Sequence, residues 1–520
     1  MKTLPSNNLK LKNMTFGSLD ANNEYRNDKF FFQKSFLTPK NFYEDDFLSG
    51  KKNFILGPKG SGKTALLNYY KELIESKGNL CKNIFYKQDI NDDIKDQFLM
   101  ELDKIDLNSM DGDDISSLNF ENLWQLYFHQ KIIEENPTFI NHDQNWKKYV
   151  REVKKIDEQH TFILENIKNI TGFGVGVNNN KISNETTLSF ARQQQKMKFN
   201  NLAYQIKQLF LKLRVNPNSK QKLFFLTDEL ELNRIHEKKF RRDSAMIRDL
   251  VIAINELNQL SNIIGRPFIW IAAIRTEVVN SIYSTGKEIN KILSDNGETL
   301  NWELNGGNSS KSPIIEMLLK KILASEELTA TSNKINENNY SNVDNNTLEK
   351  ILNRYFTHKV NNQDTVDYII RQTFLLPRDI VRLFNLIKDK YPEKDFFSQL
   401  MFEGVRSQYS QNTWTEISEE LSAIYNPDEL TGVKNILQMA SQSPFSVDSF
   451  HELAEKSRDP SIKKLLQSEV KLDEVLSNLY SVNVIGNLKN SRIRFAYRGQ
   501  PDFSFNDLCI VHDSIRKTLS

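Results

Sequence analysis

The sequence predicts an α/β protein whose core is a parallel β-sheet. Residues 53–56, 223–227 and 268–274 are short apolar runs, the pattern of strands in a parallel sheet that is covered on both faces. Residues 64–75 and 244–260 carry apolar side chains at helical spacing. Strands that alternate with helices are typical of this fold class.

Composition and length narrow the class of protein. A chain of 520 residues, 39% hydrophobic and 26% charged, is an ordinary folded chain with room for about two to four domains. The apolar run 268–274 is too short to cross a bilayer, and the first eight residues lack the apolar core of a signal peptide. Cys81 and Cys509 lie far apart, which argues against a disulfide scaffold or a zinc site. We therefore expect a cytoplasmic protein without a membrane contact.

One octapeptide matches G-x-x-x-x-G-K-S/T, the pattern of the phosphate-binding P-loop. Its residues are Gly57, Pro58, Lys59, Gly60, Ser61, Gly62, Lys63 and Thr64. The glycines let the backbone turn tightly, so that successive N–H groups can point at one anion. Lys63 would supply a cation for the β- and γ-phosphates, and Thr64 a hydroxyl for Mg²⁺. A strand precedes the loop and a helix follows it, as such a site requires. We expect ATP and Mg²⁺ as cofactors.

The strand pattern 223–227 ends in two carboxylates, Asp228 and Glu229. Asp228 would hold Mg²⁺ directly or through water, and Glu229 would polarise the attacking water. Taken alone, the segment reads equally well as a strand followed by an acidic turn. With a P-loop upstream, a Walker B motif is favoured. A glutamate at this position also favours hydrolysis over phosphoryl transfer to a small molecule, so the sequence predicts an ATPase.

Arginines at four positions are candidates for contact with a γ-phosphate. Arg275 ends the strand 268–274, where a phosphate sensor would sit; a structural ion pair is the alternative. Arg378 lies in the first turn of a helix opened by proline and could reach back to the nucleotide. Its alternative is a pair with Asp379 or a neighbour. Arg241 or Arg242 could complete the site of a neighbouring subunit, or could belong to a solvated charged face.

The chain divides into five predicted stretches. They are a lead-in at 1–45, a nucleotide-binding core at 46–300 with an insertion at 90–210, a polar linker at 301–345, a helical lid at 346–395, and a helical and winged-helix domain at 396–520. The lead-in would pack over the nucleotide base, or would only cover the surface of the protein without a role in binding. Inside the insertion we expect helices at 119–133, 144–169 and 195–213 and a β-hairpin within 172–190.

The last domain is predicted from helices near 430–440, 447–456 and 471–480, a hairpin at 484–497 and a final strand or helix at 508–519. From residue 401 onward there are 13 Lys and Arg against 16 Asp and Glu, a net charge of −3, whereas DNA-binding modules are usually basic. The hairpin itself carries Lys489, Arg492, Arg494 and Arg498. Contact with nucleic acid and contact with protein both stay open.

The order of these elements resembles that of the AAA+/STAND-like branch of P-loop ATPases. The chain also looks like a bacterial family that opens with a Phe-Gly-x-x-x-Ala element, here at 16–21, and ends in a winged helix. Members of such families often lie beside nucleases or other effectors in antiviral defence loci. The resemblance implies an α/β P-loop NTPase core with a parallel sheet, a helical lid and a C-terminal winged helix.

The resemblance also implies roles for single residues. Lys63, Thr64, Asp228 and Glu229 correspond to the two Walker motifs, Arg275 to sensor 1, and Arg378 to sensor 2. The insertion departs from a minimal AAA+ core, and the sequence contains no Leu-Ser-Gly-Gly signature of an ABC-type dimer.

Two functions of different classes follow. The first is an oligomeric ATP-driven switch or assembly ATPase that regulates an effector protein, such as a nuclease, in anti-phage defence. The second is a DNA-engaging ATPase of the initiator or loader type, which would use its winged helix.

Overall fold

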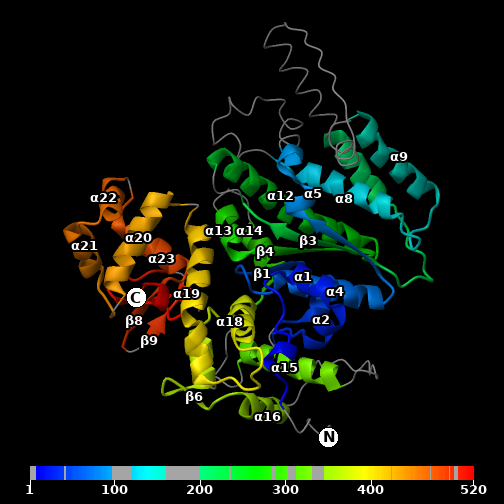
Figure 1. Ribbon diagram of the computed structural model, residues 1–520. Coiled ribbons are helices and arrows are strands. Elements are labelled where there is room, and N and C mark those ends of the chain that lie inside the picture. The colour runs from blue at the N-terminus through cyan, green and yellow to red at the C-terminus, as the bar shows by residue number, and fades with distance from the viewer. Residues whose placement is uncertain are drawn as a thin grey trace, which may run out of the picture. The chain divides into compact units, whose positions relative to one another are not determined.

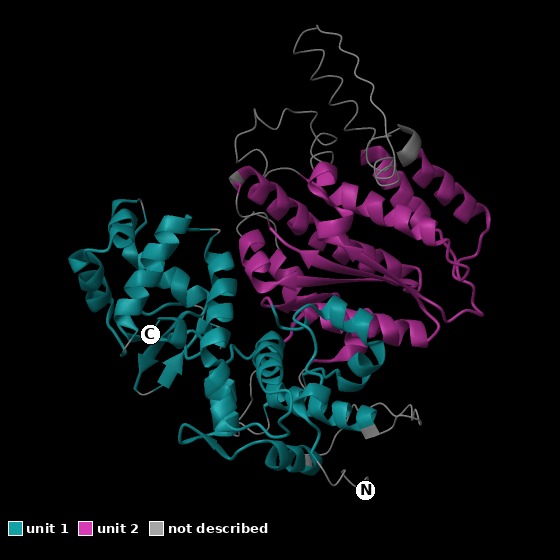
Figure 2. Cartoon of the chain, in the orientation of Figure 1, with its two compact units in different colours: residues 1–40, 60–62, 301–520 teal, residues 41–59, 63–300 magenta. Residues whose placement is uncertain are grey.

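The computed structural model describes residues 8–39, 42–95, 119–159, 200–232, 236–283, 289–302, 312–330, 345–422, 424–441, 443–468, 470–490, 492–496 and 502–519. The chain forms two compact units (Figure 2). Unit 1 comprises Met1–Lys40, Gly60–Gly62 and Asn301–Ser520, and unit 2 comprises Asn41–Lys59 and Lys63–Leu300. The predicted hairpin within 172–190 lies outside the described residues.

Unit 2 contains a five-stranded sheet in the order β2-β3-β4-β1-β5, and every neighbouring pair is parallel. Its strands are β1 (Phe54–Gly57), β2 (Leu80–Phe85), β3 (Leu223–Leu230), β4 (Phe268–Arg275) and β5 (Gly297–Thr299). The α/β class and the three predicted strands are confirmed. The edge strands β2 and β5 were not predicted.

Helices cover both faces of this sheet, as the fully apolar β3 and β4 require. In Figure 1, α8 and α12 lie over one face and α4 over the other. The helices of unit 2 are α3 (Glu44–Leu48), α4 (Lys63–Ser76), α5 (Tyr86–Asp89), α8 (Glu121–Glu135), α9 (Gln144–Gln159), α12 (Glu237–Ile263), α13 (Thr276–Tyr283) and α14 (Ile289–Asn296). Residues 200–210 are also helical.

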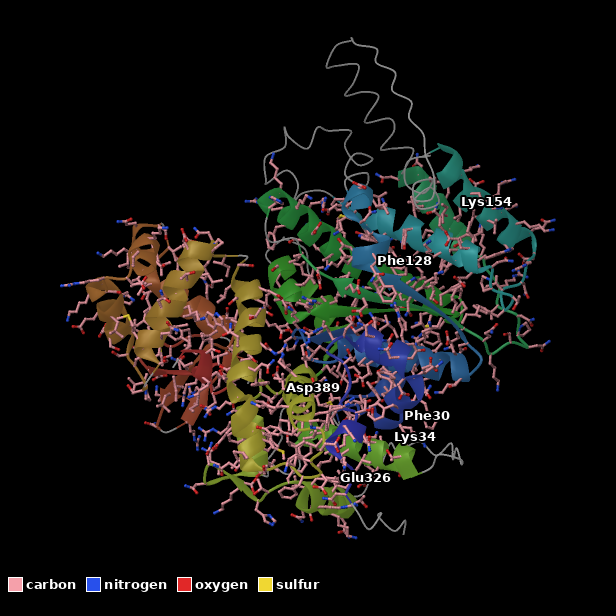
Figure 3. The ribbon with its side chains drawn as sticks, in the orientation of Figure 1. Phe30, Lys34, Phe128, Lys154, Glu326 and Asp389 are labelled. Carbon is pink, nitrogen blue, oxygen red and sulfur yellow. The ribbon has the colours of Figure 1, made fainter. Side chains whose placement is uncertain are left out.

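Aromatic packing joins the predicted insertion to the sheet. Phe128 of α8, labelled in Figure 3, meets Phe225 and Trp270 edge-on with ring centroids 6.0 Å apart, and those two rings stack on each other. On the same helix, buried His129 bonds the Tyr149 hydroxyl of α9 at 2.9 Å. The described part of the insertion is therefore built into the core of unit 2.

A buried amide anchors α12 to the middle of the sheet. Asn258 Nδ2 donates to the Trp270 carbonyl at 2.9 Å, and the Trp270 N–H donates to Asn258 Oδ1 at 3.1 Å. Both residues are almost fully enclosed. Since unpaired backbone groups are costly at such depth, this pair fixes the position of β4, the strand that ends in Arg275.

Unit 1 contains two helical cores. The first is formed by side chains of η1 (Leu11–Asn13), α15 (Pro313–Ala330), α16 (Asn345–Tyr355), β6 (Lys359–Val360), α17 (Thr365–Arg371), α18 (Pro377–Lys390) and the first half of α19 (Gln399–Leu421). Unit 1 also contains α1 (Ala21–Asn27), α2 (Lys29–Ser35) and the short strand β7 (Gln363–Asp364). Phe16 of the lead-in is buried there against Phe384 and Phe397. The lead-in thus contributes a core residue to unit 1.

The second core holds the C-terminal elements. They are α20 (Pro427–Ala440), α21 (Val447–Lys456), α22 (Pro460–Gln467), α23 (Leu472–Ser481), β8 (Ile485–Lys489), β9 (Arg492–Arg494), β10 (Leu508–Val511) and α24 (Arg516–Leu519). The three strands form an antiparallel sheet in the order β10-β8-β9. The predicted helices and hairpin lie at the expected positions, and α22 is additional. Helix α19 belongs to both cores, with Tyr409 in the first and Trp414 in the second.

Candidate nucleotide-binding site

The predicted phosphate loop connects β1 to α4. Gly60 and Gly62 have φ angles of 83° and 95°, which only glycine adopts without strain. The Lys63 side chain is 8% exposed, and its Nζ donates to the carbonyls of Gly57 and Pro58, each at 2.8 Å. The lysine thus folds back over the start of its own loop. Residues of the right type and backbone geometry for a phosphate cradle are in place.

Asp228 lies next to the threonine of the loop. The Thr64 hydroxyl hydrogen-bonds its carboxylate, and burial raises the pKa of Asp228 above the usual aspartate value. The residue is 7% exposed, and its Oδ2 has no hydrogen-bond partner. Buried polar atoms are rarely left unpaired. A carboxylate oxygen and a hydroxyl oxygen at this place fit Mg²⁺, which prefers oxygen ligands and keeps further positions for water and phosphate.

No all-protein metal cage is present in the described part of the chain, where no group of three or more His, Cys, Asp or Glu side chains could hold a metal ion. The oxygen pair of Thr64 and Asp228 therefore suits a metal that arrives with its own phosphate and water ligands.

Glu229 has a strained backbone. Its φ is 61°, in a left-handed region that costs a residue with a side chain roughly 1–2 kcal/mol. The pairing of β3 with β4 shifts register between Thr227 and Leu230, so Glu229 lies in a bulge, a feature that often re-aims a side chain beside an active site. Strain of this kind concentrates at functional sites. This geometry distinguishes Glu229 from an ordinary strand residue.

The carboxylate of Glu229 lies beside a polar side chain from α5, the short helix that follows the neighbouring strand β2. Phe85, the end of β2, is in register with Asp228, which brings Gln88 of α5 near the same edge of the sheet. Gln88 Nε2 lies 3.4 and 3.5 Å from the two Glu229 carboxylate oxygens. Burial, and then the negative charges of Asp228 and Glu231, raise the pKa of Glu229. A raised pKa makes the carboxylate a stronger base.

Arg275 ends β4, which lies between the loop strand β1 and the Asp228 strand β3. It is in register with Gly57, so it stands at the same edge of the sheet as both motifs. Its guanidinium forms an ion pair with Glu231, and Lys87 lies 3.4 Å from the other Glu231 oxygen. The structure therefore contains the ion pair that was the alternative for Arg275, and identifies Glu231 as its partner.

Arg378 contacts the phosphate loop through its backbone and a glutamate through its side chain. Its N–H lies 3.4 Å from the Gly60 carbonyl, and its Nη1 donates to Glu416 Oε1 at 2.5 Å. Asp379 instead lies 3.9 Å from Arg382. The partner of the Arg378 guanidinium is thus a residue of α19, which the sequence did not identify.

The hypothesis of an arginine that reaches a neighbouring subunit does not hold for Arg242. Its side chain is 1% exposed and pairs with Asp92 and Asp243, at 2.7 and 2.8 Å. Lys95 lies 3.4 Å from the same Asp243. A guanidinium held in this buried charge cluster has a structural role. The alternative, that Arg242 belongs to a solvated charged face, does not hold either.

A known family model matches part of the helical region of unit 1. Residues 330–418 match the family model described as the FunZ-associated C-terminal helical domain. This range holds α16, α17, α18 and most of α19, and so includes both Arg378 and Glu416. No curated protein matches the chain significantly. Among the described residues, no helix is long and apolar enough to cross a bilayer.

Proposed function

We propose that this chain binds ATP with Mg²⁺, hydrolyses it, and acts as an oligomeric switch that regulates an effector protein. The observation that carries the proposal is the hydrogen bond between Thr64 of the phosphate loop and Asp228 of the Asp-Glu strand. Two motifs far apart in the sequence thereby share one edge of a parallel sheet, where α/β proteins bind their ligands.

The residues divide the chemistry among them. Backbone N–H groups of the loop and the Lys63 ammonium bind the phosphates, while Thr64 and Asp228 hold the metal. Mg²⁺, when bound, neutralises part of the phosphate charge. Glu229 orients a water molecule and accepts its proton. Arg275 changes partner from Glu231 to the γ-phosphate, which makes it a sensor of the nucleotide state.

The cellular role rests on resemblance alone. The order of elements is similar to that of ATPases that accompany nucleases or other effectors in antiviral defence loci, and a fold does not by itself imply a function. We propose that a homo-oligomer of this chain, located in the cytoplasm, controls such an effector through its C-terminal region.

A DNA-engaging role is the second candidate, and one observation favours it. Lys489 and Arg492 are directly opposite each other on β8 and β9, and like charges in this relation destabilise a sheet. Arg492 and Arg494 are both exposed. A basic hairpin of this kind would suit phosphates, although Asp507 lies 3.5 Å from Lys489.

Three variants test the ATPase. Lys63→Ala should abolish binding of a fluorescent ATP analogue, and Glu229→Gln should bind it without releasing phosphate. Lys77→Ala, an exposed lysine just after α4, is the matched control and should behave as wild type. Normal turnover by Glu229→Gln would remove Glu229 from the mechanism.

Two further measurements separate the candidate roles. ATPase rates with and without duplex DNA should agree for an effector switch and differ for a DNA-engaging enzyme. Light scattering with a non-hydrolysable ATP analogue should detect a species larger than the 60.6 kDa chain. A strict monomer that retains full activity would contradict the oligomer.

A further inference from the structure

Helix α9 of unit 2 has one basic face. Lys147, Lys148, Arg151 and Lys154 are all exposed on this helix, and Figure 3 labels Lys154. Side chains three, four and seven residues apart lie on the same side of a helix, so the four cations form a basic stripe. Because an α-helix rises about 1.5 Å per residue, the stripe is about 10 Å long.

The opposite face of α9 is built into the core of unit 2. Trp146, Tyr149 and Val153 are buried, and the Tyr149 hydroxyl bonds buried His129 of α8 at 2.9 Å. Helix α8 lies between α9 and the sheet, on which it packs through Phe128 (Figure 1). The basic stripe is therefore fixed on a rigid support and faces away from the core.

Few carboxylates compensate the charges of the stripe. Between residues 144 and 155 the helix has a single one, Glu152, which is buried. It pairs with Lys155 at 2.7 Å and lies 3.5 Å from Arg151 Nε. The three lysines of the stripe make no ion pair with a residue that the structure describes. Since the whole chain has a formal net charge of only +2, the stripe is a local concentration of positive charge.

The chemistry of the stripe limits its partner. No apolar side chain is exposed between residues 144 and 155. A helix that binds a membrane surface inserts an apolar face into the lipid, and the apolar face of α9 is buried in the protein. Protein interfaces centre on aromatic and aliphatic side chains and are depleted of lysine. A phosphate backbone needs no apolar contact, because release of its counterions drives the binding.

We propose that the basic stripe of α9 is a contact surface for the phosphate backbone of double-stranded nucleic acid. Its length of about 10 Å matches roughly three steps of about 3.4 Å along one strand of B-DNA. Single strands stack their bases on exposed aromatic rings, which the stripe lacks. Contacts to phosphate carry no sequence information, so the binding should be non-specific. The stripe belongs to unit 2 and the β8–β9 hairpin to unit 1, and the proposal does not depend on the ATP site.

Fluorescence anisotropy of a labelled DNA duplex with the full-length chain, without nucleotide and at several salt concentrations, tests the proposal. Lys147→Glu/Lys154→Glu should preserve α9, because lysine and glutamate have similar helix propensities. Since each phosphate contact contributes about −0.9 to the slope of log K against log salt, the slope should become about 1.8 less steep and the affinity at about 0.1 M salt should fall roughly fiftyfold or more.

The matched control is Lys77→Glu/Lys291→Glu, which changes the net charge by the same amount. Both lysines are exposed residues of unit 2, just after α4 and on α14. This variant should keep the slope of wild type, because its charges lie outside the stripe. An equal loss of affinity in the control would indicate a general charge effect and would overturn the proposal.

The choice of probe separates the possible anions. Duplex RNA of the same length distinguishes the two kinds of duplex, and binding of either one through the stripe supports the proposal. A preference for single-stranded DNA, binding only to phosphatidylserine vesicles or to polyglutamate, or no binding at all would overturn it. Wild-type binding by the α9 variant, with a loss in Arg492→Glu/Arg494→Glu, would assign the contact to the hairpin and would overturn it as well.

Discussion

Asp228→Asn should have opposite effects on the free protein and on its complex with Mg·ATP. In the free protein a carboxylate is buried, its Oδ2 has no partner, and burial raises its pKa. Asparagine has the same shape and no charge to desolvate. The amide nitrogen that replaces Oδ2 is a buried donor, and any N–H of it that stays without an acceptor removes part of the gain. We expect a net stabilisation of about 1 kcal/mol, within the range of substitutions that relieve a strained functional site.

The complex should show the reverse. A ligand at 100 times its Kd stabilises the folded state by about 2.7 kcal/mol. For a unit of about 250 residues, 1 kcal/mol corresponds to roughly 2–4 °C in Tm. Wild type should therefore gain roughly 5–10 °C from saturating Mg·ATP. The variant should begin roughly 2–4 °C higher and gain little, because the metal has lost its carboxylate ligand.

Thermal denaturation with and without Mg·ATP measures both effects. The control is Asp295→Asn, at an exposed residue of α14.

The pH dependence of stability follows from the direction in which the Asp228 pKa is shifted. Since the folded pKa of Asp228 is raised, its contribution to wild-type stability is lost as the pH rises through that pKa. The advantage of the variant should thus be larger at pH 8 than in acid. A variant that is less stable when free, yet keeps the full Mg·ATP shift, would refute the reasoning.

Three further outcomes are expected. Asn258→Leu should destabilise the protein to urea by about 1–3 kcal/mol, because the buried N–H of Trp270 loses its acceptor; a smaller loss would show that another acceptor replaces it. Burial raises the pKa of Asp379 from 3.8 to about 6. The free energy of unfolding of wild type should therefore fall by up to about 3 kcal/mol relative to that of Asp379→Asn as the pH rises from about 4 to 7. Parallel pH profiles of the two proteins would contradict this. At the positive φ of Glu229, Glu229→Gly should be up to about 1 kcal/mol more stable than Glu229→Ala, with neither variant turning over ATP; the opposite order would indicate that the backbone relaxes there.

The sequence by itself was sufficient to predict the features that depend on residues close together along the chain. The octapeptide 57–64 specifies its loop because its glycines and lysine act within one turn of chain. The apolar runs that became β1, β3 and β4 are continuous, so their burial on both faces could be predicted. The C-terminal helices and hairpin were located for the same reason. The ATP, Mg²⁺, oligomer and effector assignments stay predictions.

Only the tertiary structure decided which polar and charged side chains meet. Gln88 comes near Glu229 through the register of β2 with β3, and Glu416 meets Arg378 because α19 packs along α18. Nothing in the local pattern around these residues marks them. Glu231 carried a weak signal, since it lies two residues after Glu229. Arg242 resembled an exposed finger, yet Asp92 and Asp243 enclose it. A charged side chain looks the same in sequence whether solvent or an opposite charge satisfies it, and the partner depends on contacts that form only when distant segments pack together.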